Sequence, residues 1–358
     1  MTDVLHVITG LGVGGAETML VQLTAALQAR GLTQHVVGLS ALDARARDIE
    51  SAGVEVTILG ARSAAVFPLA MPKLLRTVRA LRPRILQGWM YHGNLAASLC
   101  HRLAGNRGER TLMWNLRASN MDDARYGRLI RVSALVSRSV EVAIANSQAG
   151  IDFHRARGFR PKRFVLIDNG VDVARFRPDP GLRRQVRGEL GIGESEIVAI
   201  HAARVDPMKD HATLLAAMAQ LPSLTAILAG SGTQALDTPK NVRALGPRGD
   251  LERLYAAADI VVSSSAFGEG FANVIAEGMS SALMPVATDV GDARRIIGDT
   301  GTIVAPRDVQ GLAAALRELA ALSDVERRRR GQAARRRIAA NFALERSVDA
   351  YAQLYAAA

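Results

Sequence analysis

The chain has 358 residues, of which 49% are hydrophobic, enough for the cores of two domains or of one large domain. Its single cysteine, Cys100, excludes a disulfide framework and a cysteine zinc site, and it fits a reducing compartment. A net charge of +11 predicts anionic partners, but an aromatic content of 4% argues against single-stranded nucleic acid, because base stacking requires aromatic side chains.

The N-terminal segment, MTDVLHVITG, predicts a strand that runs into a glycine loop. It lacks the basic start and the apolar centre of a secretory signal. No stretch of about 18 uncharged apolar residues predicts a membrane span. We therefore expect a cytoplasmic protein.

The first predicted strand, Val4 to Ile8, leads into a glycine-rich loop and a helix. Gly10, Gly12 and Gly15 form G-x-G-x-x-G between them, the spacing of a dinucleotide-binding loop. That mechanism requires an acidic residue about 20 positions later for the ribose. The second strand, around Gln34 to Ser40, ends without one. The alternative is a loop whose backbone approaches a phosphate or a sugar.

Predicted strands at 54–59, 85–87 and 142–145 alternate with helices, a pattern typical of a parallel α/β sheet. His92 comes just after one strand end, where ligands bind in such sheets, although a loop histidine is also commonly structural. Arg117 ends the next strand and is expected to face the same edge of the sheet.

A helix with many arginines is predicted from Tyr126 to Arg138. At 100° per residue its arginines share one side, and Leu129, Val132 and Val136 lie toward the other. The arginines are Arg125, Arg128, Arg131 and Arg138. Such a helix either presents an ordinary solvated face above a core stripe or binds an anionic membrane.

The second half of the chain repeats the strand–helix plan. Arg204 and Lys209 follow one strand end and can clamp a diphosphate, Arg as a fork and Lys as a point charge. A solvated basic loop is the alternative. A further strand ends in a glycine turn at Gly230, and the segment of Arg248 and Leu251 follows a short strand and is expected to present backbone to a nucleobase.

The stretch from Ser263 to Thr288, SSSAFGEGFANVIAEGMSSALMPVAT, joins a buried strand, a turn with two glycines and a helix. Glu269 lies on the predicted loop and Glu277 inside the predicted helix, so the unpaired N–H groups of a helix start lie between two carboxylates. These N–H groups suit an anionic group, and carboxylates accept hydrogen bonds from sugar hydroxyls. A strand–loop–helix corner with two surface glutamates is the alternative.

The sequence of this stretch resembles the signature of the family 4 retaining glycosyltransferases. The matching residues are E-G-F-A-N-V-I-A-E-G-M followed by P-V-A-T-D-V-G. Other segments are similar to motifs of the same family: G-G-A-E after the first strand, D-N-G-V-D from Asp168, and the spacing of Arg204 and Lys209. The resemblance covers nearly the whole chain in order. It implies an α/β fold with two Rossmann-like domains facing a cleft (GT-B).

The resemblance also implies the domain plan and the reaction. We expect an acceptor domain at 1–168 and a nucleotide-sugar donor domain at 169–358, with the last helix, about 342–358, crossing back to the first. The enzyme would move a hexose or N-acetylhexosamine, with retention, from a UDP-sugar to a saccharide or polyprenyl-linked acceptor in cell-surface polysaccharide synthesis. Alternatives are a nucleotide-sugar epimerase of the same architecture, a glycosidase that uses Glu269 and Glu277, and a nucleic-acid-binding protein.

The resemblance assigns roles to particular residues. Glu277 is expected to bind ribose hydroxyls, Glu269 a hydroxyl of the sugar, and Arg204 and Lys209 the diphosphate, with His92 orienting the sugar. The full donor-binding set is Gly14, Gly15, Gly230, Arg248, Leu251, Gly270, Phe271, Ala272, Asn273 and Glu277. Because the chain has no Asp-x-Asp pair and fixed cations supply positive charge, we expect neither a metal nor a cofactor.

The chain departs from the family pattern at a few positions. Asp168 replaces a proline, Ala203 a glycine and Ala282 another glycine, and Pro285 is displaced by one residue. We expect the changes at Ala282 and Pro285 together to alter the packing behind the donor site. Because many bacterial relatives use lipid-linked acceptors, we expect the arginine helix to attach the enzyme peripherally to the inner face of the plasma membrane.

Overall fold

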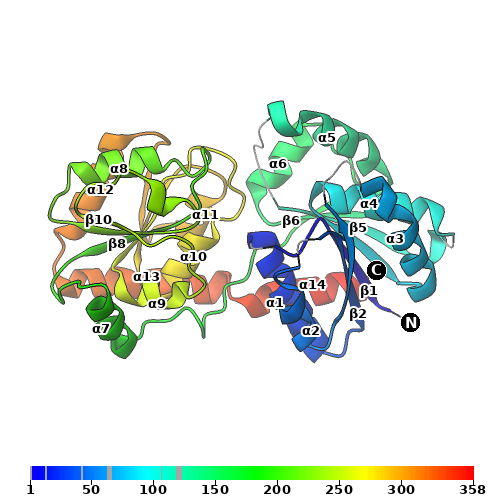
Figure 1. Cartoon of the computed structure of the whole chain (residues 1–358), viewed down its shortest axis with the longest axis horizontal. Helices are drawn as coiled ribbons and strands as arrows, with labels where there is room; N and C mark the ends of the chain where they lie inside the picture. The colour runs from blue at the N-terminus through cyan, green and yellow to red at the C-terminus, as the bar shows by residue number, and fades with distance from the viewer. Residues whose placement is uncertain (1, 13, 42, 63–66, 106, 118–122) are drawn as a thin grey trace. The chain divides into compact units, whose positions relative to one another are not determined.

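The computed structural model of the protein describes residues 2–12, 14–41, 43–62, 67–105, 107–117 and 123–358. Of residues 67–68, 107 and 123–125 it describes the backbone alone. The chain divides into two units, each with its own parallel sheet (Figure 1). The first unit comprises Met1–Asp168 and Ser347–Ala358, and the second comprises Asn169–Arg346.

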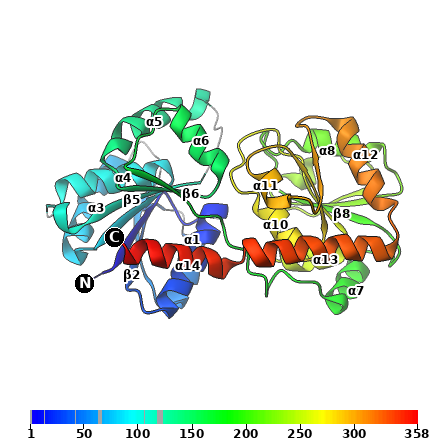
Figure 2. The same ribbon diagram turned by 180° about the vertical axis from the view of Figure 1, so that it is seen from behind.

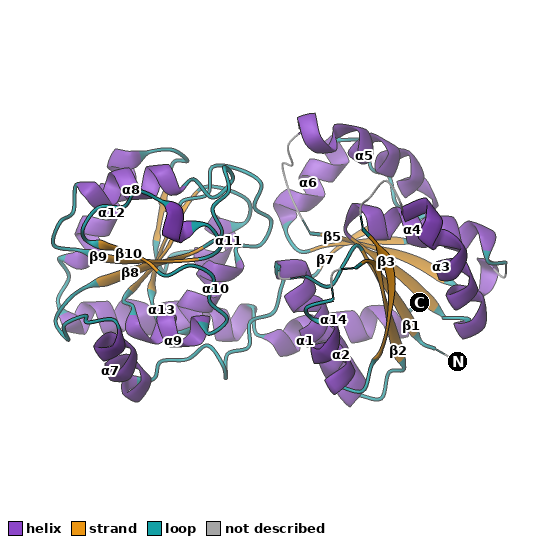
Figure 3. Cartoon of the chain, viewed as in Figure 1, coloured by secondary structure: helices purple, strands orange, loops and turns teal. Residues whose placement is uncertain are grey.

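The first unit contains parallel strands in the order β3-β2-β1-β4-β5-β6-β7. They are β1 (Val4–Ile8), β2 (Gln34–Ser40), β3 (Glu55–Ala61), β4 (Ile85–Trp89), β5 (Thr111–Leu116), β6 (Val142–Ala145) and β7 (Arg163–Leu166). Strands such as β1 and β6 are buried along their whole length, because helices cover both faces of the sheet (Figure 3). The strand order reverses between β1 and β4, which is where α/β sheets of this kind bind ligands.

The helices of the first unit alternate with its strands. They are α1 (Gly15–Ala29), α2 (Ala46–Ser51), α3 (Phe67–Leu81), α4 (Met90–Leu103), α5 (Asp123–Val136) and α6 (Gln148–Ala156), with short 3₁₀ turns η2 (Arg107–Glu109) and η3 (Ser137–Ser139). Ser147 caps α6, because its hydroxyl accepts a hydrogen bond from the N–H of Gly150 at 3.0 Å.

Helix α4 begins at Met90, directly after β4, so His92 lies within a helix. Two glycines permit this. A Cβ atom on Gly88 would lie 2.4 Å from the Cα of Asn94, and one on Gly93 would lie 2.4 Å from the carbonyl oxygen of Val7. The helix backbone therefore packs directly on β1 and β4.

The second unit has the strand order β10-β9-β8-β11-β12-β13, also parallel. Its strands are β8 (Val198–Ala202), β9 (Thr225–Ala229), β10 (Val242–Ala244), β11 (Ile260–Ser263), β12 (Met284–Thr288) and β13 (Thr302–Val304). Its helices are α7 (Pro180–Glu189), α8 (His211–Ala219), η4 (Thr233–Ala235), α9 (Leu251–Ala257), α10 (Asn273–Ser280), α11 (Ala293–Ile297), α12 (Val309–Ala320) and α13 (Asp324–Asn341). The two Rossmann-like domains expected from the sequence are thus confirmed.

The last helix, α14 (Leu344–Ala356), packs on the first unit from Ser347 onward (Figure 2). Tyr351 and Tyr355 are fully buried there. A side-chain nitrogen of Arg84 donates to the carbonyl of Tyr355 at 2.7 Å, and Arg30 pairs with Asp349 at 2.7 Å. The amphipathic end of the chain is therefore part of the core of the first unit.

The arginines of α13 stabilise the second unit through backbone carbonyls. Arg335 donates to the last residue of α10, and Arg337 donates at 2.7 Å to two carbonyls in α11. Arg327 donates at 3.4 Å to the last residue of α12. Each guanidinium lies at the carbonyl end of a helix, where a positive charge is favourable. Part of the basic tail is thus used within the fold.

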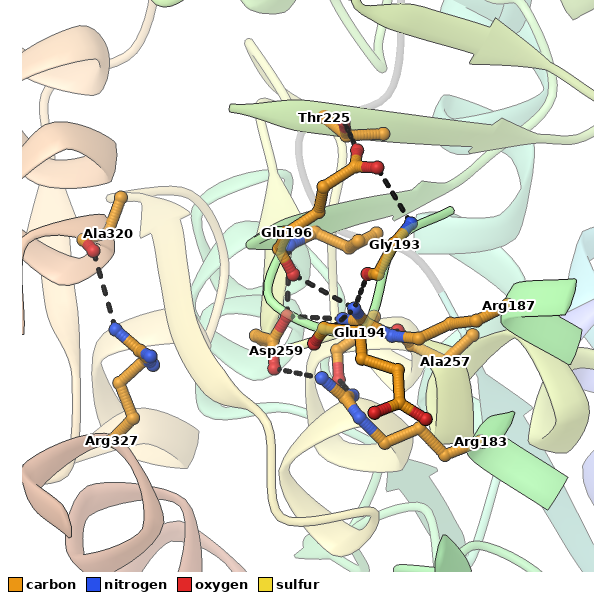
Figure 4. Close-up of polar contacts among 12 residues, drawn as sticks. Arg183, Arg187, Gly193, Glu194, Glu196, Thr225, Ala257, Asp259, Ala320 and Arg327 are labelled. Carbon is orange, nitrogen blue, oxygen red and sulfur yellow. Dashed lines mark hydrogen bonds and ion pairs between the residues drawn. The ribbon is translucent and has the colours of Figure 1, made fainter. Parts of the chain in front are cut away.

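Asp259, just before β11, joins helix α7 to the start of the sheet (Figure 4). Its carboxylate pairs with Arg183 at 2.7 Å and with Arg187 at 2.8 Å. Arg187, whose side chain is 2% exposed, also donates to the carbonyls of Gly193 and Ala257. A buried guanidinium with its donors occupied in this way holds the amino edge of the sheet together.

Candidate functional site

The loops at the carboxyl edge of the second sheet are fixed to one another. The Thr288 hydroxyl, at the end of β12, donates to the carbonyl of Ser265 at 2.6 Å. The N–H of Ala266 donates to the carbonyl of Met208 at 2.9 Å. The loop after β11 is therefore held by the loops after β8 and β12, at the edge where parallel sheets bind ligands.

Lys209 and Glu269 form an ion pair at this edge. The Lys209 ammonium donates to Oε1 of Glu269, and the Ser265 hydroxyl donates to the same oxygen at 2.7 Å. The residue Glu269 is only 9% exposed. Each charge is thus compensated in a place that is largely withdrawn from water. The structure brings these two predicted residues together.

Arg204 lies on the same loop as Lys209 and has a different partner. Its guanidinium is exposed and pairs with the carboxylate of Asp206 at 3.2 Å. Asp206 also accepts a hydrogen bond at 2.9 Å from the N–H of Met208, which fixes the turn. The guanidinium is therefore held by a neighbouring residue of its own loop and remains in contact with solvent.

Glu277 lies inside α10, and the helix α9 supplies its partner. The fully buried Tyr255 donates from its hydroxyl to Oε2 of Glu277 at 3.2 Å. Burial raises the pKa of Glu277 to about 7, and the hydrogen bond from Tyr255 and the charge of Arg175 lower it by less. Glu277 therefore titrates near neutral pH. Tyr255 was not identified from the sequence, because it comes from a different helix.

Two glycines allow neighbouring loops to touch through their backbones. Gly230 has a φ of +152°, and a Cβ atom there would lie 2.0 Å from the carbonyl oxygen of Ala203. Gly291 has a φ of +61°, and its Cβ atom would lie 2.5 Å from the carbonyl oxygen of Glu269 and 2.6 Å from that of Gly270. A side chain at either position would push the loops of the site apart. Gly291 was missed in the sequence as a site residue.

The segment between the two glutamates starts α10. Ala272 is the N-cap residue, and its side chain makes no capping bond. Asn273 accepts a hydrogen bond at 2.7 Å from the side-chain amide of Asn169, in the segment that begins the second unit. Phe271 is buried with its ring centroid 5.6 Å from that of Phe342. Its side chain therefore belongs to the core, which leaves the backbone of this segment for a ligand.

The loop after β10 carries the other predicted residues of this edge. Arg248 pairs with Asp250 through two bonds of 2.7 and 2.6 Å, which raise the pKa of the guanidinium. Leu251 is the first residue of α9 and packs against the core of the second unit. The side chains at both positions thus have structural partners, as expected if the backbone is what meets a ligand.

The remaining predicted residues belong to the first unit. His92 lies in the first turn of α4 rather than on a loop, because that helix starts at Met90, and burial lowers the pKa of its imidazole. Gly14 is the N-cap residue of α1 and Gly15 is its first residue. A Cβ atom on Gly14 would lie 2.5 Å from a carboxylate oxygen of Glu17, which folds back over the helix start.

The described residues contain neither a candidate metal site nor a candidate membrane-spanning helix. No group of three or more His, Cys, Asp or Glu side chains in this part of the chain is arranged to hold a metal ion. Within the same residues, no helix combines the length and the apolar character needed to cross a bilayer.

Comparisons with protein families cover most of the chain. Residues 13–175 match the family described as Glycosyltransferase Family 4, and residues 196–321 match the family described as Glycosyl transferases group 1. A D-inositol 3-phosphate glycosyltransferase from Geodermatophilus obscurus is 33% identical over 228 residues, 56% of this chain and 49% of that protein. One from Mycobacterium marinum is 34% identical over 184 residues, 46% and 38% of the two chains. The chain spans about half the length of these relatives, or less.

Solved structures are similar to the whole chain. HepE from Anabaena, in complex with UDP and glucose, has a TM-score of 0.88 at 23% identity over 100% of both chains. Sucrose-phosphate synthase from Thermosynechococcus elongatus has a TM-score of 0.81 at 20% identity, over 99% of this chain and 100% of that one. At these identities the likeness establishes the fold, and it confirms the GT-B fold expected from the sequence.

Proposed function

The chain belongs to the family 4 glycosyltransferases, and from that premise we propose that it transfers a sugar, with retention, from a UDP-sugar to a saccharide or polyprenyl-linked acceptor. The observation that carries the proposal is the Lys209–Glu269 ion pair at the carboxyl edge of the second sheet, on the loop that leads into the helix of Glu277. A cation for phosphate and two acids for hydroxyls are the groups that a nucleotide sugar requires. HepE, whose structure contains UDP-glucose, supports the choice of donor.

The proposed roles follow the chemistry of the groups. Lys209 and Arg204 stabilise the diphosphate as negative charge grows on the leaving group, an electrostatic effect that commonly dominates such barriers. Donor binding then draws Lys209 away from Glu269, whose carboxylate accepts a sugar hydroxyl. Glu277 accepts the ribose hydroxyls. The N–H groups from Gly270 to Ala272, at the start of α10, face the anionic part of the donor, whereas that of Asn273 donates to the carbonyl of Phe271 at 3.0 Å.

The first unit would supply the acceptor side. We assign His92 to orienting the transferred sugar, and the start of α1 at Gly14 and Gly15 to backbone contact with donor or acceptor. The sugar is a hexose or an N-acetylhexosamine, and the product belongs to cell-surface polysaccharide or glycolipid synthesis. The reaction proceeds without a metal, because the fixed cations supply the positive charge.

We further propose that the enzyme works at the inner face of the plasma membrane. Arg128, Arg131 and Arg138 are exposed on α5 and η3. The side chain of Arg125 lies outside the described residues. Val132 is 50% exposed and Leu135 is 70% exposed. The expectation that Val132 lies on the core side of the helix is thus wrong.

At 100° per residue, Val132 and Leu135 fall on the same arc as Arg128 and Arg131, and the side opposite is the buried one. Arginines that alternate with exposed apolar side chains fit the surface of an anionic bilayer, where lipid phosphates meet acyl chains. This arc supports the proposed peripheral attachment.

Donor screening tests the reaction. The protein is heated with UDP, UDP-glucose, UDP-galactose and their N-acetylhexosamine forms in excess EDTA, and UDP release is then measured with and without polyprenyl-phosphate saccharides. A donor at about 100 times its Kd adds about 2.7 kcal/mol of stability. No stabilisation and no UDP release would overturn the proposal. Isomerised donor without an acceptor would indicate the epimerase instead.

A further inference from the structure

Three consecutive serines stand at the end of strand β11, Ser263 as its last residue and Ser264 and Ser265 directly after it, and the last two contact the two halves of the Lys209–Glu269 ion pair. Ser264 donates from its hydroxyl to the carbonyl of Lys209 at 2.9 Å and to that of Asp210 at 3.1 Å. Ser265 donates to Oε1 of Glu269 at 2.7 Å. All three serines are buried. One short segment therefore contacts both the backbone of the cation and the carboxylate of the acid.

The directions of these bonds follow from the strand. Successive side chains of an extended segment point to opposite sides, so Ser264 faces the loop after β8 while Ser265 faces the loop that carries Glu269. The Thr288 hydroxyl fixes the backbone just after Ser265, because it donates to the carbonyl of Ser265 at 2.6 Å. The hydroxyls of Ser264 and Ser265 are thus held in place by the sheet itself.

We propose that Ser264 and Ser265 are positioning residues, which act through Lys209 and Glu269 respectively. The proposal rests on the proposed function of that pair. When a diphosphate draws the Lys209 ammonium away, Ser265 stays on the carboxylate and keeps it aimed at the sugar. Ser264 keeps the backbone of Lys209 at the strand edge, so that the ammonium reaches either partner.

Ser263 provides a matched control within the same run. Its hydroxyl lies 3.4 Å from that of Ser265, a long contact, and no hydrogen bond from it to Lys209 or to Glu269 occurs among the described residues. Ser263→Ala removes the same atom from an equally buried site on the same strand end. It therefore measures what the loss of a buried hydroxyl costs without the positioning effect.

The test compares Ser263→Ala, Ser264→Ala and Ser265→Ala by melting temperature, by calorimetric affinity for UDP, and by kcat and KM for UDP release from UDP-glucose. UDP lacks the sugar, so Ser265→Ala should leave its affinity unchanged while kcat falls about ten- to a hundredfold, the loss expected for one hydrogen bond to a charged group. Ser264→Ala should weaken UDP about two- to tenfold. Ser263→Ala should match the wild type in UDP affinity and in kcat.

Glu269→Ala gives a further check, because Ser265→Ala should cause no additional loss once its partner is absent. Equal kcat values for Ser265→Ala, Ser263→Ala and the wild type would overturn the serine proposal alone. Equal losses of kcat in all three serine variants would also overturn it, because they would indicate a general packing defect. A wild type that neither binds UDP nor consumes the nucleotide sugars of the donor panel would instead overturn the proposed function, and the serine proposal with it.

Discussion

The hydroxyl of Tyr255 donates a hydrogen bond at 3.2 Å to the carboxylate of Glu277; Tyr255 is fully buried and Glu277 is half-buried. The pKa of Glu277 is raised to about 7, chiefly by burial. If Glu277 accepts hydrogen bonds from the ribose, the ionised form binds better than the acid, because only the ionised form presents four lone pairs as acceptors.

UDP affinity should therefore rise as the pH increases from 6 to 8. Calorimetric titration of UDP across this range measures the effect, and Glu277→Gln should abolish the pH dependence while binding more weakly throughout. The carboxylate has the opposite effect on stability. The carboxyl of Glu277 has a pKa of about 7 in the folded state and of 4.5 in the unfolded state, so only the folded state binds the proton between these values. The free energy of unfolding therefore falls as the pH rises through this range, by at most about 3 kcal/mol. A flat UDP titration would remove Glu277 from the ribose site.

Lys209→Ala and Arg204→Ala should each lower turnover by about 10²–10³ if both cations meet the diphosphate. The two cations differ in their surroundings, since Lys209 pairs with the largely buried Glu269 whereas Arg204 is exposed. Lys209→Ala should therefore also lower the melting temperature, and Arg204→Ala should not. Kinetics and melting curves are compared with Lys162→Ala, an exposed cation of the first unit. Normal turnover in both variants would remove the clamp from the mechanism.

Ala282→Gly should stabilise the protein. Ala282 has a φ of +62°, and the turn after α10 has the two bonds of a Schellman motif, from Ala282 to Met279 and from Leu283 to Gly278, both at 3.0 Å. Glycine adopts this conformation without the cost of about 1 kcal/mol that a side chain incurs. Urea unfolding measures the gain. Ser281→Gly is the control, because Ser281 has a φ of −79° and glycine should destabilise there. An Ala282→Gly variant that is less stable than the wild type would contradict this account of the turn.

Much of the fold follows from short-range patterns, but parts of the candidate site do not. Apolar runs such as β1 and β11 can only be buried strands, and Lys209 and Glu269 follow strand ends, so a parallel sheet brings them to one edge. The partners Tyr255 and Gly291 depend on which helix and loop pack there, which no local pattern contains. His92 lies inside α4 and not on a loop, because Gly88 and Gly93 permit the close packing that lets this helix begin directly after β4.

Asp259→Ala should destabilise the second unit by about 3–5 kcal/mol, because it leaves Arg183 and the buried Arg187 without their carboxylate (Figure 4). The site loops lie at the opposite edge of the sheet, so UDP affinity below the melting temperature should be preserved. Asp289→Ala, which removes a more exposed ion pair, serves as the control for stability. A loss of unfolding free energy no larger than that of Asp289→Ala would show that the ion pairs of Asp259 contribute little to stability.

Membrane binding should require both kinds of exposed side chain on α5. One variant changes Arg128, Arg131 and Arg138 to Gln, and a second changes Val132 and Leu135 to Ser. Each arginine near an anionic bilayer contributes about 1 kcal/mol, so the first variant should bind vesicles with phosphatidylglycerol about a hundredfold more weakly at low salt. The second should lose the part of the binding that persists at high salt, because apolar insertion is not screened.

The control must separate this surface from the net charge of +11. Changing Arg328, Arg329 and Arg336 to Gln removes the same charge from exposed positions on α13, in the other unit. Co-sedimentation with neutral and anionic vesicles is then measured for the wild type and all three variants. Binding reduced equally by the α5 and α13 arginine changes would indicate attraction by net charge, and absence of wild-type binding at low salt would end the membrane proposal. Loss confined to the α5 variants, with UDP affinity intact, is the expected result, because α5 takes no part in the proposed donor contacts.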